Sequence, residues 1–465
     1  MIRSLTTATA VALLAGCASF SADGGFESVE QLTKARAGQA PVWQRTENQS
    51  DSTQTRVAQL LGQPLTADSA VELALLNNRR LQAGFQALGI AEADFVRAGR
   101  LGNPSFGFGR LSGGGHVEIE RTLGFNLLGL LTMPLVRQVE GQRFEMAKLQ
   151  AASEAVGLAA ETRRAYFQAV AGQELVGYFQ QVRAAAEASR DLAARMAAAG
   201  NFSKLEHLRE QAFYADATSS LARAQHRAFS EREHLVRLLG LAGGNALKLP
   251  QRLPDLPKQP AEPKDAEQTA MTNRLDIIAA RRSTRSVAES LGLSRATRMV
   301  NVLHAGYANV SETGEVRRDG YEIELELPLF DFGSSRVARA EAVYMQALHR
   351  TAQTALDARS EVRQSYSAYR TAYDLARHYR DEVVPLRKRI SEENVLRYNG
   401  MLIGVFELLA DSRAQISSVT GYVEALRAYW IADTDLQTAL FGRSPGTGET
   451  SPAPAAAAAT AVAAH

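Results

Sequence analysis

The sequence predicts a mainly α-helical fold that carries a smaller, membrane-facing part made of β-strands. In residues 321–329 the odd positions are apolar and the even positions are three glutamates and a proline, the pattern of a strand with one apolar and one water-facing side. From Ser334 a helical pattern continues without proline until Pro385 and without glycine until Gly400. The same order of strands and long helices occurs twice, about 200 positions apart, which indicates two structural repeats.

The chain begins with a predicted signal peptide, residues 1–16. Arg3 is followed by a short apolar stretch and by Leu14-Ala15-Gly16-Cys17, which resembles a bacterial lipobox. We therefore expect cleavage before Cys17 and a lipid on its thiol, with Ala18 favouring the outer membrane. The alternative is ordinary cleavage beside a chance cysteine. Residues 17–64 are polar without a clear period, so this lipidated N-terminal extension is predicted to be an extended tether.

The first repeat is predicted to span residues 65–242. A helix begins at its N-cap candidate Thr66, runs to about Arg100 and is followed by strands at about 105–130. These strands form a hairpin with one apolar and one polar face. Arg121 falls on the apolar side, and we place it near the lipid headgroups, where charge costs less. Long helices then follow at about 135–199 and 202–240.

A linker with five prolines, residues 243–264, separates the two repeats. The second repeat, residues 265–442, is predicted to contain a helix at about 266–298 and strands at about 299–330, with a polar loop at 311–320. Long helices follow at about 334–397 and 402–441. Residues 443–465 are rich in alanine, proline and glycine and are predicted to be a disordered tail.

The lengths of these elements predict a tube attached to a membrane wall. A helix of about 65 residues is about 98 Å long at ~1.5 Å per residue. No apolar stretch after the signal peptide is long enough for a spanning helix, so the membrane would be crossed by strands. Four strands cannot close a barrel, and a bilayer tolerates no open sheet edge. We therefore expect a trimer with one 12-stranded barrel continued by a periplasmic α-helical tunnel.

Composition argues against other classes of protein. Lys plus Arg (52) nearly equals Asp plus Glu (50), so no nucleic-acid partner is indicated. The histidines are scattered, and His226 and His234 lack the neighbours of a zinc site. We expect no metal site, no catalytic residues, no cofactor apart from the lipid on Cys17, and no enzyme.

Together these features resemble the TolC family of outer-membrane efflux channels. The resemblance covers about Leu65 to Gly442 and includes a PLFDFG-like junction at Pro328–Gly333. The predicted lipid anchor is similar to that of the lipoprotein branch associated with RND pumps. The resemblance implies a homotrimer in the outer membrane that works with a periplasmic adaptor and an inner-membrane RND-type pump.

The same resemblance implies a gate at the periplasmic tip. Tyr398 and Gly400 match the tyrosine and glycine that precede the gate helix, and Glu407 falls at the first gate carboxylate. Ala410 stands at the second position, with Asp411 one residue later. Three Glu407 side chains in a ring would repel one another and favour cations. The alternative is that Glu407 and Asp411 belong to a solvated helix face.

Two further groups of carboxylates complete the site prediction. Glu206, in the turn of the first repeat, is a second gate candidate. The glutamates on the polar side of the strands are predicted to face the barrel lumen: Glu118, Glu120, Glu322, Glu324 and Glu326. The predicted function is a passive outer-membrane exit for drugs or metal cations. The alternative is a periplasmic adaptor lipoprotein, which would need β-rich domains around one helical hairpin.

Overall fold

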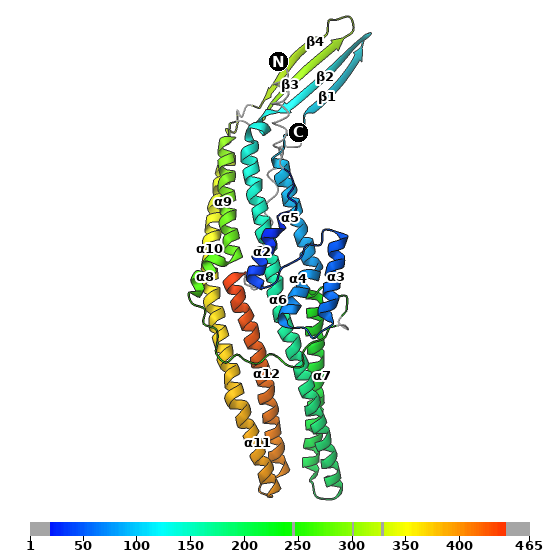
Figure 1. Ribbon diagram of the computed structural model, residues 1–465, viewed down its shortest axis with the longest axis vertical. Helices are drawn as coiled ribbons and strands as arrows, with labels where there is room; N and C mark the ends of the chain where they lie inside the picture. The colour runs from blue at the N-terminus through cyan, green and yellow to red at the C-terminus, as the bar shows by residue number, and fades with distance from the viewer. Residues whose placement is uncertain (1–18, 244–246, 300–301, 327–329, 443–465) are drawn as a thin grey trace. The chain divides into compact units, whose positions relative to one another are not determined.

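The computed structural model describes residues 19–243, 247–299, 302–326 and 330–442 (Figure 1). The signal peptide, Cys17 and the tail at 443–465 lie outside the described residues. The chain divides into two compact units. Unit 1 holds Arg79–Glu154, Asp276–Asp357 and the N-terminal residues up to Lys34, and unit 2 holds the rest.

The predicted order of helices and strands is confirmed in both repeats. The elements of the first half are α2 (Phe26–Ala37), α3 (Glu47–Leu61), α4 (Ala67–Asn77), α5 (Arg79–Ala98), β1 (Ser105–Gly113), β2 (His116–Asn126), α6 (Leu127–Ala198) and α7 (Lys204–Leu238). Those of the second half are α8 (Ala266–Asn273), α9 (Leu275–Ala296), β3 (Leu303–Glu312), β4 (Arg318–Leu325), α10 (Ser334–His378), the π-helical turn η1 (Tyr379–Val383), α11 (Val384–Asn399) and α12 (Val405–Phe441).

The four strands form one antiparallel sheet in unit 1, in the order β1-β2-β3-β4 (Figure 1). Partners across an antiparallel pair lie on the same face, so the register shows which side chains share a face. One row runs Phe106–Leu123–Tyr307–Tyr321 across all four strands. The predicted alternation is therefore confirmed. The boundaries differ, because β3 continues to Glu312 and β4 begins at Arg318, inside the predicted loop.

The first strand-to-helix junction lies earlier than predicted. Asn126 ends β2, and its Oδ1 accepts a hydrogen bond of 2.7 Å from the backbone N–H of Gly129. This N-cap starts α6 at Leu127, so the predictions of a strand to about residue 130 and a helix from about 135 were wrong at this point. Pro134 lies inside α6, where its ring removes one backbone donor.

The second junction is a tight turn that requires glycine. Asp331 accepts from the backbone N–H of Ser334 at 3.0 Å and so caps α10. Gly333 has a φ of 74°, and a Cβ there would lie 2.5 Å from the carbonyl oxygen of Arg298. Only glycine fits both the left-handed backbone and this close approach. Pro328 and Leu329 of the predicted motif lie outside the described residues.

The long helix of the second repeat is interrupted by one π-helical turn. The N–H of Val384 bonds to the carbonyl of Tyr379, five residues earlier, just before Pro385. The wider turn accommodates a proline that would otherwise clash with the preceding carbonyls. The Tyr379 ring lies against Gly421 of α12, where a Cβ would lie 2.8 Å from the ring. The prediction of a helix from 334 to about 397 is confirmed, with this turn inside it.

The prediction of an extended tether at 17–64 was wrong for the described residues. Residues 26–37 and 47–61 are helical, and Thr46 and Gln49 form a capping box at the start of α3. In unit 1, the ring of Phe26 meets that of Phe85 edge to face at 5.0 Å. Helix α2 is therefore packed onto α5 rather than free.

The two predicted helices that precede the strands are each broken in two. Asn78 has an extended backbone and separates α4 from α5, and Arg274 does the same between α8 and α9. Neither break contains glycine or proline, so sequence patterns did not predict them. Each break brings a polar side chain to the end of another helix: Asn78 to the end of α7, and Arg274 to the end of α12.

The proline-rich linker has no helix or strand in its described residues up to 264, as predicted. It is nevertheless packed against the helices of unit 2. Trp430 Nε1 donates to the carbonyl of Pro254 at 3.0 Å, and the hydroxyl of Tyr373 donates to that of Lys258 at 2.8 Å. The hydroxyl of Tyr369 accepts from the N–H of Ala261 at 2.7 Å. Aromatic side chains of α10 and α12 thus fix the linker.

Candidate channel lining and gate

The sheet register collects the predicted glutamates on one face. Glu120 pairs with Gly109 and Val310, Glu322 with Gly306, and Glu324 with His304. The full set of charged or titratable side chains on this "carboxylate face" is His116, Glu118, Glu120, His304, Glu312, Arg318, Glu322 and Glu324. Glu326 follows β4 and bonds through its N–H to Val302. The carboxylates outnumber the one arginine, so this face carries a negative potential.

Glu312 and Arg318 belong to the carboxylate face, although the sequence predicts a loop at 311–320. Glu312 pairs directly with Glu118, an arrangement of like charges that is unfavourable by itself. Arg318 Nη2 lies 3.2 Å from Glu312 Oε2 and offsets this repulsion. The strict alternation of apolar and polar positions does not extend to these two residues. Only the strand register shows that they lie on this face.

The opposite face of the sheet is apolar and aromatic. Its side chains include Phe106, Phe108, Val117, Ile119, Leu123, Phe125, Leu303, Tyr307, Tyr321, Ile323 and Leu325. Most of them are exposed in the single chain, with Tyr321 at 85% and Phe106 at 71%. Within the described part of the chain, nothing covers this "apolar face". An exposed aromatic surface of this kind is typical of a contact with lipid or with another protein.

The two helical hairpins turn through the same motif, with a different residue at its left-handed position. The N–H of Leu402 bonds to the carbonyl of Arg397, and the N–H of Met401 to that of Tyr398. This is a Schellman motif with Met401 at φ 59°. In the first repeat Gly200, at φ 77°, holds that position. Gly400, the predicted turn glycine, has an ordinary φ of −79°.

The two gate candidates at equivalent helix positions differ in their environment. Glu206 is the third residue of α7, and its Oε2 accepts from the backbone N–H of Ser203 at 2.8 Å. This hydrogen bond is the main reason that the pKa of Glu206 is lowered. Glu407 is the third residue of α12, but Gly404 stands where Ser203 stands and offers no side-chain cap. Glu206 is thus held in a capping box, whereas Glu407 is exposed.

Asp411 does not share a solvated face with Glu407. Asp411 is only 8% exposed, and its Oδ2 has no hydrogen-bond partner among the described residues. Glu210 holds the equivalent position in α7, is 3% exposed and accepts from Ser189 Oγ at 2.8 Å. The alternative of a solvated i,i+4 pair is therefore wrong for Asp411. The buried carboxylate of Glu210 was missed, although it follows Glu206 at the same spacing.

The hairpins pack together within unit 2 close to these residues. Val182, Ala186, Phe213 and Ala217 form a small buried cluster against which Ile416 packs. The guanidinium of Arg413 lies 5.0 Å from the centre of the Phe213 ring. Helix α12 of the second repeat thus contacts α6 and α7 of the first. Tyr398, near the end of α11, is partly exposed.

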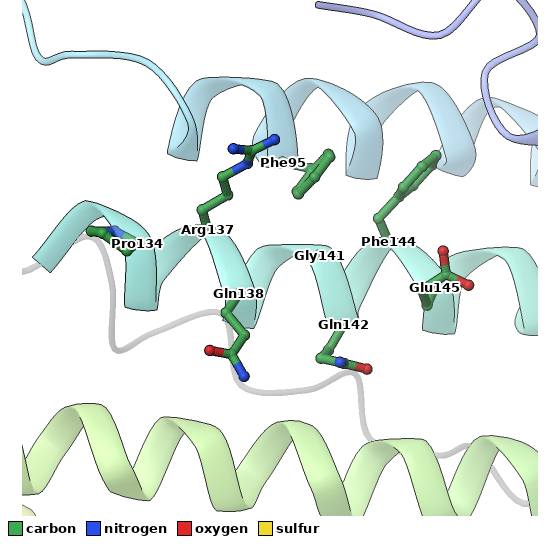
Figure 2. Close-up of a pocket in the computed structure, with 8 residues that line it drawn as sticks. All are labelled: Phe95, Pro134, Arg137, Gln138, Gly141, Gln142, Phe144 and Glu145. Carbon is green, nitrogen blue, oxygen red and sulfur yellow. The ribbon is translucent and has the colours of Figure 1, made fainter. Parts of the chain in front are cut away.

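A separate hollow of about 540 Å³ lies between α5 and α6 in unit 1 (Figure 2). The rings of Phe95 and Phe144 stack across it at 6.1 Å, and the Arg137 guanidinium lies 5.6 Å from the Phe95 ring. Figure 2 shows Gln138 and Gln142 pointing to the other side of α6. Because its polar side chains diverge, this hollow lacks the converging groups of a specific ligand site.

No group of three His, Cys, Asp or Glu residues in the described part of the chain is placed to hold a metal ion. None of the helices in the described ranges contains a segment that is both apolar and long enough to span a bilayer.

Comparison with solved structures shows which fold this is. The chain is similar to the Campylobacter jejuni CmeC outer membrane channel, with a TM-score of 0.70, 15% identity, and 80% of this chain and 85% of that chain covered. The outer-membrane channel OprN gives a TM-score of 0.68 at 20% identity, covering 83% and 92%. CusC, which changes conformation as it folds and forms a transmembrane channel, gives a TM-score of 0.67 at 17% identity, covering 81% of this chain and 92% of that chain. No model of a known family and no curated protein matches the sequence. The predicted TolC-type fold is confirmed.

Proposed function

We propose that this protein is the passive outer-membrane exit channel of a tripartite efflux system. The observation that carries the proposal is the four-stranded sheet with two unlike faces and two open edges. β1 and β4 each pair on one side only. One face is aromatic and uncovered, and the other carries carboxylates. Such a sheet suits a barrel wall between lipid and water, but only if further copies close it.

Three copies satisfy this requirement, because three sheets of four strands give twelve. Two copies would give eight, and an eight-stranded barrel is filled by its own side chains. The protein thus acts as a homotrimer. Its helical repeats extend the barrel as a tunnel, and solved structures with this fold are outer-membrane channels.

The carboxylate face makes the lumen negative, so the barrel favours cationic solutes. Glu118, Glu120, Glu322 and Glu324 line it in each copy, and Glu326 continues the series. At the other end, Glu407 of each copy narrows the tunnel and its charge adds to the preference for cations. Drugs with basic groups and metal cations are the substrate classes that fit this lining.

The remaining parts of the proposal concern partners and anchoring. Solute enters from a periplasmic adaptor and an inner-membrane RND-type pump, which supplies the energy, and the channel itself catalyses no reaction. The lipid on Cys17 attaches the N-terminus to the outer membrane. The packing of the N-terminal segment supports such an anchor, because both the N–H and the hydroxyl of Ser21 bond to Glu92, at 2.6 and 2.5 Å. These bonds fix the chain on α5 only a few residues after Cys17.

The test is a conductance measurement on the full-length protein in planar bilayers, with SDS gel mobility before and after heating. A channel gives discrete conductance steps, a heat-sensitive trimer band and a preference for K⁺ over Cl⁻. Replacing Glu120 and Glu322 together with glutamine should lower that preference. A protein with neither conductance nor a heat-sensitive band would be an adaptor instead. Conductance without any effect of the double replacement would remove the carboxylate face from the lumen.

A further inference from the structure

The apolar face of the sheet contains one row of polar side chains. Arg121, Asn309 and Asp319 are paired in register across β2, β3 and β4. They lie on the same face as Phe108 of β1, which pairs with Arg121. A row of this kind is unexpected on a surface that is otherwise aromatic and aliphatic. Its position and bonding therefore need a physical reason.

The row is a connected hydrogen-bond network that holds Arg121 in place. The carboxylate of Asp319 accepts from the amide of Asn309 and, at 2.7 Å, from the hydroxyl of Tyr307. Asn309 Oδ1 in turn accepts from Arg121 Nη1 at 3.1 Å. Asn309 is only 1% exposed. A guanidinium has five N–H donors, so Arg121 keeps donors for a partner outside the chain.

A second arginine lies next to this row. Arg110 pairs with Ile119, one row nearer the hairpin ends and on the same apolar face. Its side chain is exposed, and among the described residues it has no acidic partner. Arg110 and Arg121 are thus diagonal neighbours, within reach of one ligand group for long side chains. Asp319 is the only acid in these two rows, and Asn309 and Tyr307 already bond to it.

The depth of the row follows from the strand geometry. Asn309 lies six residues further along β3 than Leu303 at the base of the sheet, about 20 Å of strand at ~3.4 Å per residue. At the usual tilt this is on the order of 15 Å of membrane depth, which places the row in the outer half of an apolar band about 25 Å tall. The rows in between are apolar, and the nearest contains Tyr307 and Tyr321. Aromatic girdles mark the edge of the apolar band, and arginine costs little free energy only there.

We propose that Arg110 and Arg121 bind a phosphate group of an outer-leaflet lipid, a phosphorylated glycolipid, at the outer edge of the apolar band. This inference rests on the proposed function, because it requires the apolar face to contact the membrane. Arginine forms paired hydrogen bonds with phosphate oxygens, and a phosphate fits the charge and spacing of two fixed guanidinium groups. Asn309 and Asp319 are positioning residues that orient Arg121.

The test measures binding of lipid A to the full-length protein in detergent by native mass spectrometry. Three probes are used: bisphosphorylated lipid A, the same lipid without its phosphates, and inorganic phosphate. The variants are R110Q and R121Q, and the control is R318Q, which removes an arginine from the carboxylate face of the same sheet. N309A keeps every charge but releases the Arg121 guanidinium. Heat-sensitive gel mobility checks that each variant is folded.

The expected result is that bisphosphorylated lipid A binds in preference to the other two probes. R110Q or R121Q should weaken its binding about tenfold, because each variant loses one charge-assisted hydrogen bond. R318Q should leave binding unchanged, and N309A should give an intermediate loss. Equal binding of the phosphate-free lipid, equal binding of inorganic phosphate, or an equal loss in R318Q would overturn the proposal. If R121Q does not fold, R110Q decides alone, since its side chain has no internal partner. Wild-type conductance separates failure of this site from failure of the channel function.

Discussion

Asn78 and Arg274 cap the last helix of their own repeats from equivalent positions. Asn78 Nδ2 donates to the carbonyl of Leu238 at 2.8 Å, and Arg274 Nη1 donates to that of Ala439 at 3.2 Å. Both residues have an extended backbone, with ψ 117° and 129°, between two helices. The final carbonyls of a helix have no partner within it, so each break supplies one. The duplication thus preserves a tertiary contact while the residue type has changed.

Replacing Arg274 with alanine should destabilise the protein by about 3–5 kcal/mol, the cost of breaking a buried ion pair on one side. Arg274 is 1% exposed and lies 2.7 Å from Glu361 Oε2. Thermal unfolding of the detergent-solubilised protein measures the effect. Arg363→Ala is the matched control, because its pair with Glu267 is exposed and should be worth less than about 1 kcal/mol. Similar losses in both variants would contradict the buried role of Arg274.

Replacing Met401 with glycine should stabilise the protein by about 1 kcal/mol, because Met401 holds a left-handed backbone that side chains disfavour. Gly400→Ala should be close to neutral, since its φ is −79° and a Cβ would lie 3.5 Å from its nearest neighbour. Gly200→Ala in the first repeat should lower the free energy of unfolding by about as much as Met401→Gly raises it. Chemical unfolding of the three variants checks the set. A larger loss in Gly400→Ala than in Gly200→Ala would place the left-handed residue elsewhere.

Replacing Glu407 with glutamine should lower the preference for cations in bilayer recordings, because its exposed carboxylate is not used by a cap. Glu206→Gln should leave the preference unchanged, since the Glu206 carboxylate is held by Ser203. Reversal potentials in a KCl gradient measure both. Unchanged selectivity in Glu407→Gln would remove that residue from the gate.

Replacing Gly404 with serine should also lower the cation preference without removing any charge. The backbone at Gly404, φ −82° and ψ 163°, is close to that at Ser203, φ −71° and ψ 156°. A serine there can form the capping box that the first repeat has and draw the Glu407 carboxylate onto the helix end. The same reversal-potential measurement detects it, with Gly404→Ala as the control that has a side chain but no acceptor. An equal cation preference in the two variants would contradict the idea that selectivity depends on an uncapped Glu407 carboxylate.

Glu231→Gln should raise stability at neutral pH. Burial raises the pKa of Glu231, with Arg427 and Arg227 acting in the opposite direction, and its Oε2 has no hydrogen-bond partner among the described residues. When the pKa of a carboxyl group is higher in the folded than in the unfolded protein, the folded protein loses stability as the pH rises from the unfolded pKa through the folded pKa. The gain should therefore shrink as pH falls toward the ordinary value of 4.5. Melting temperatures between pH 4 and pH 8 check this, and a gain that grows on acidification would contradict the sign.

Local patterns predicted most of the fold. Alternation in residues 321–325 placed Glu322 and Glu324 on one face, because successive strand residues always point to opposite sides. The predicted N-cap at Thr66 is present in the structure, where Thr66 accepts from the backbone N–H of Ser69. The residues of the capping box, Thr46 and Gln49, also have the required spacing in the sequence. They lie in a polar segment for which the sequence predicts an extended tether.

The sequence by itself determined the elements, their duplication and the two-faced sheet, because helix and strand periodicities depend on nearby residues. Only the tertiary structure decided where helices break and which carboxylates are available. Asn78 and Arg274 interrupt helices to satisfy carbonyls of distant segments, and Asp411 is buried although Glu407, four residues earlier, is exposed. The row of Arg121, Asn309 and Asp319 likewise exists only through strand register. Pairing energies between distant segments fix these features, and no local pattern encodes them.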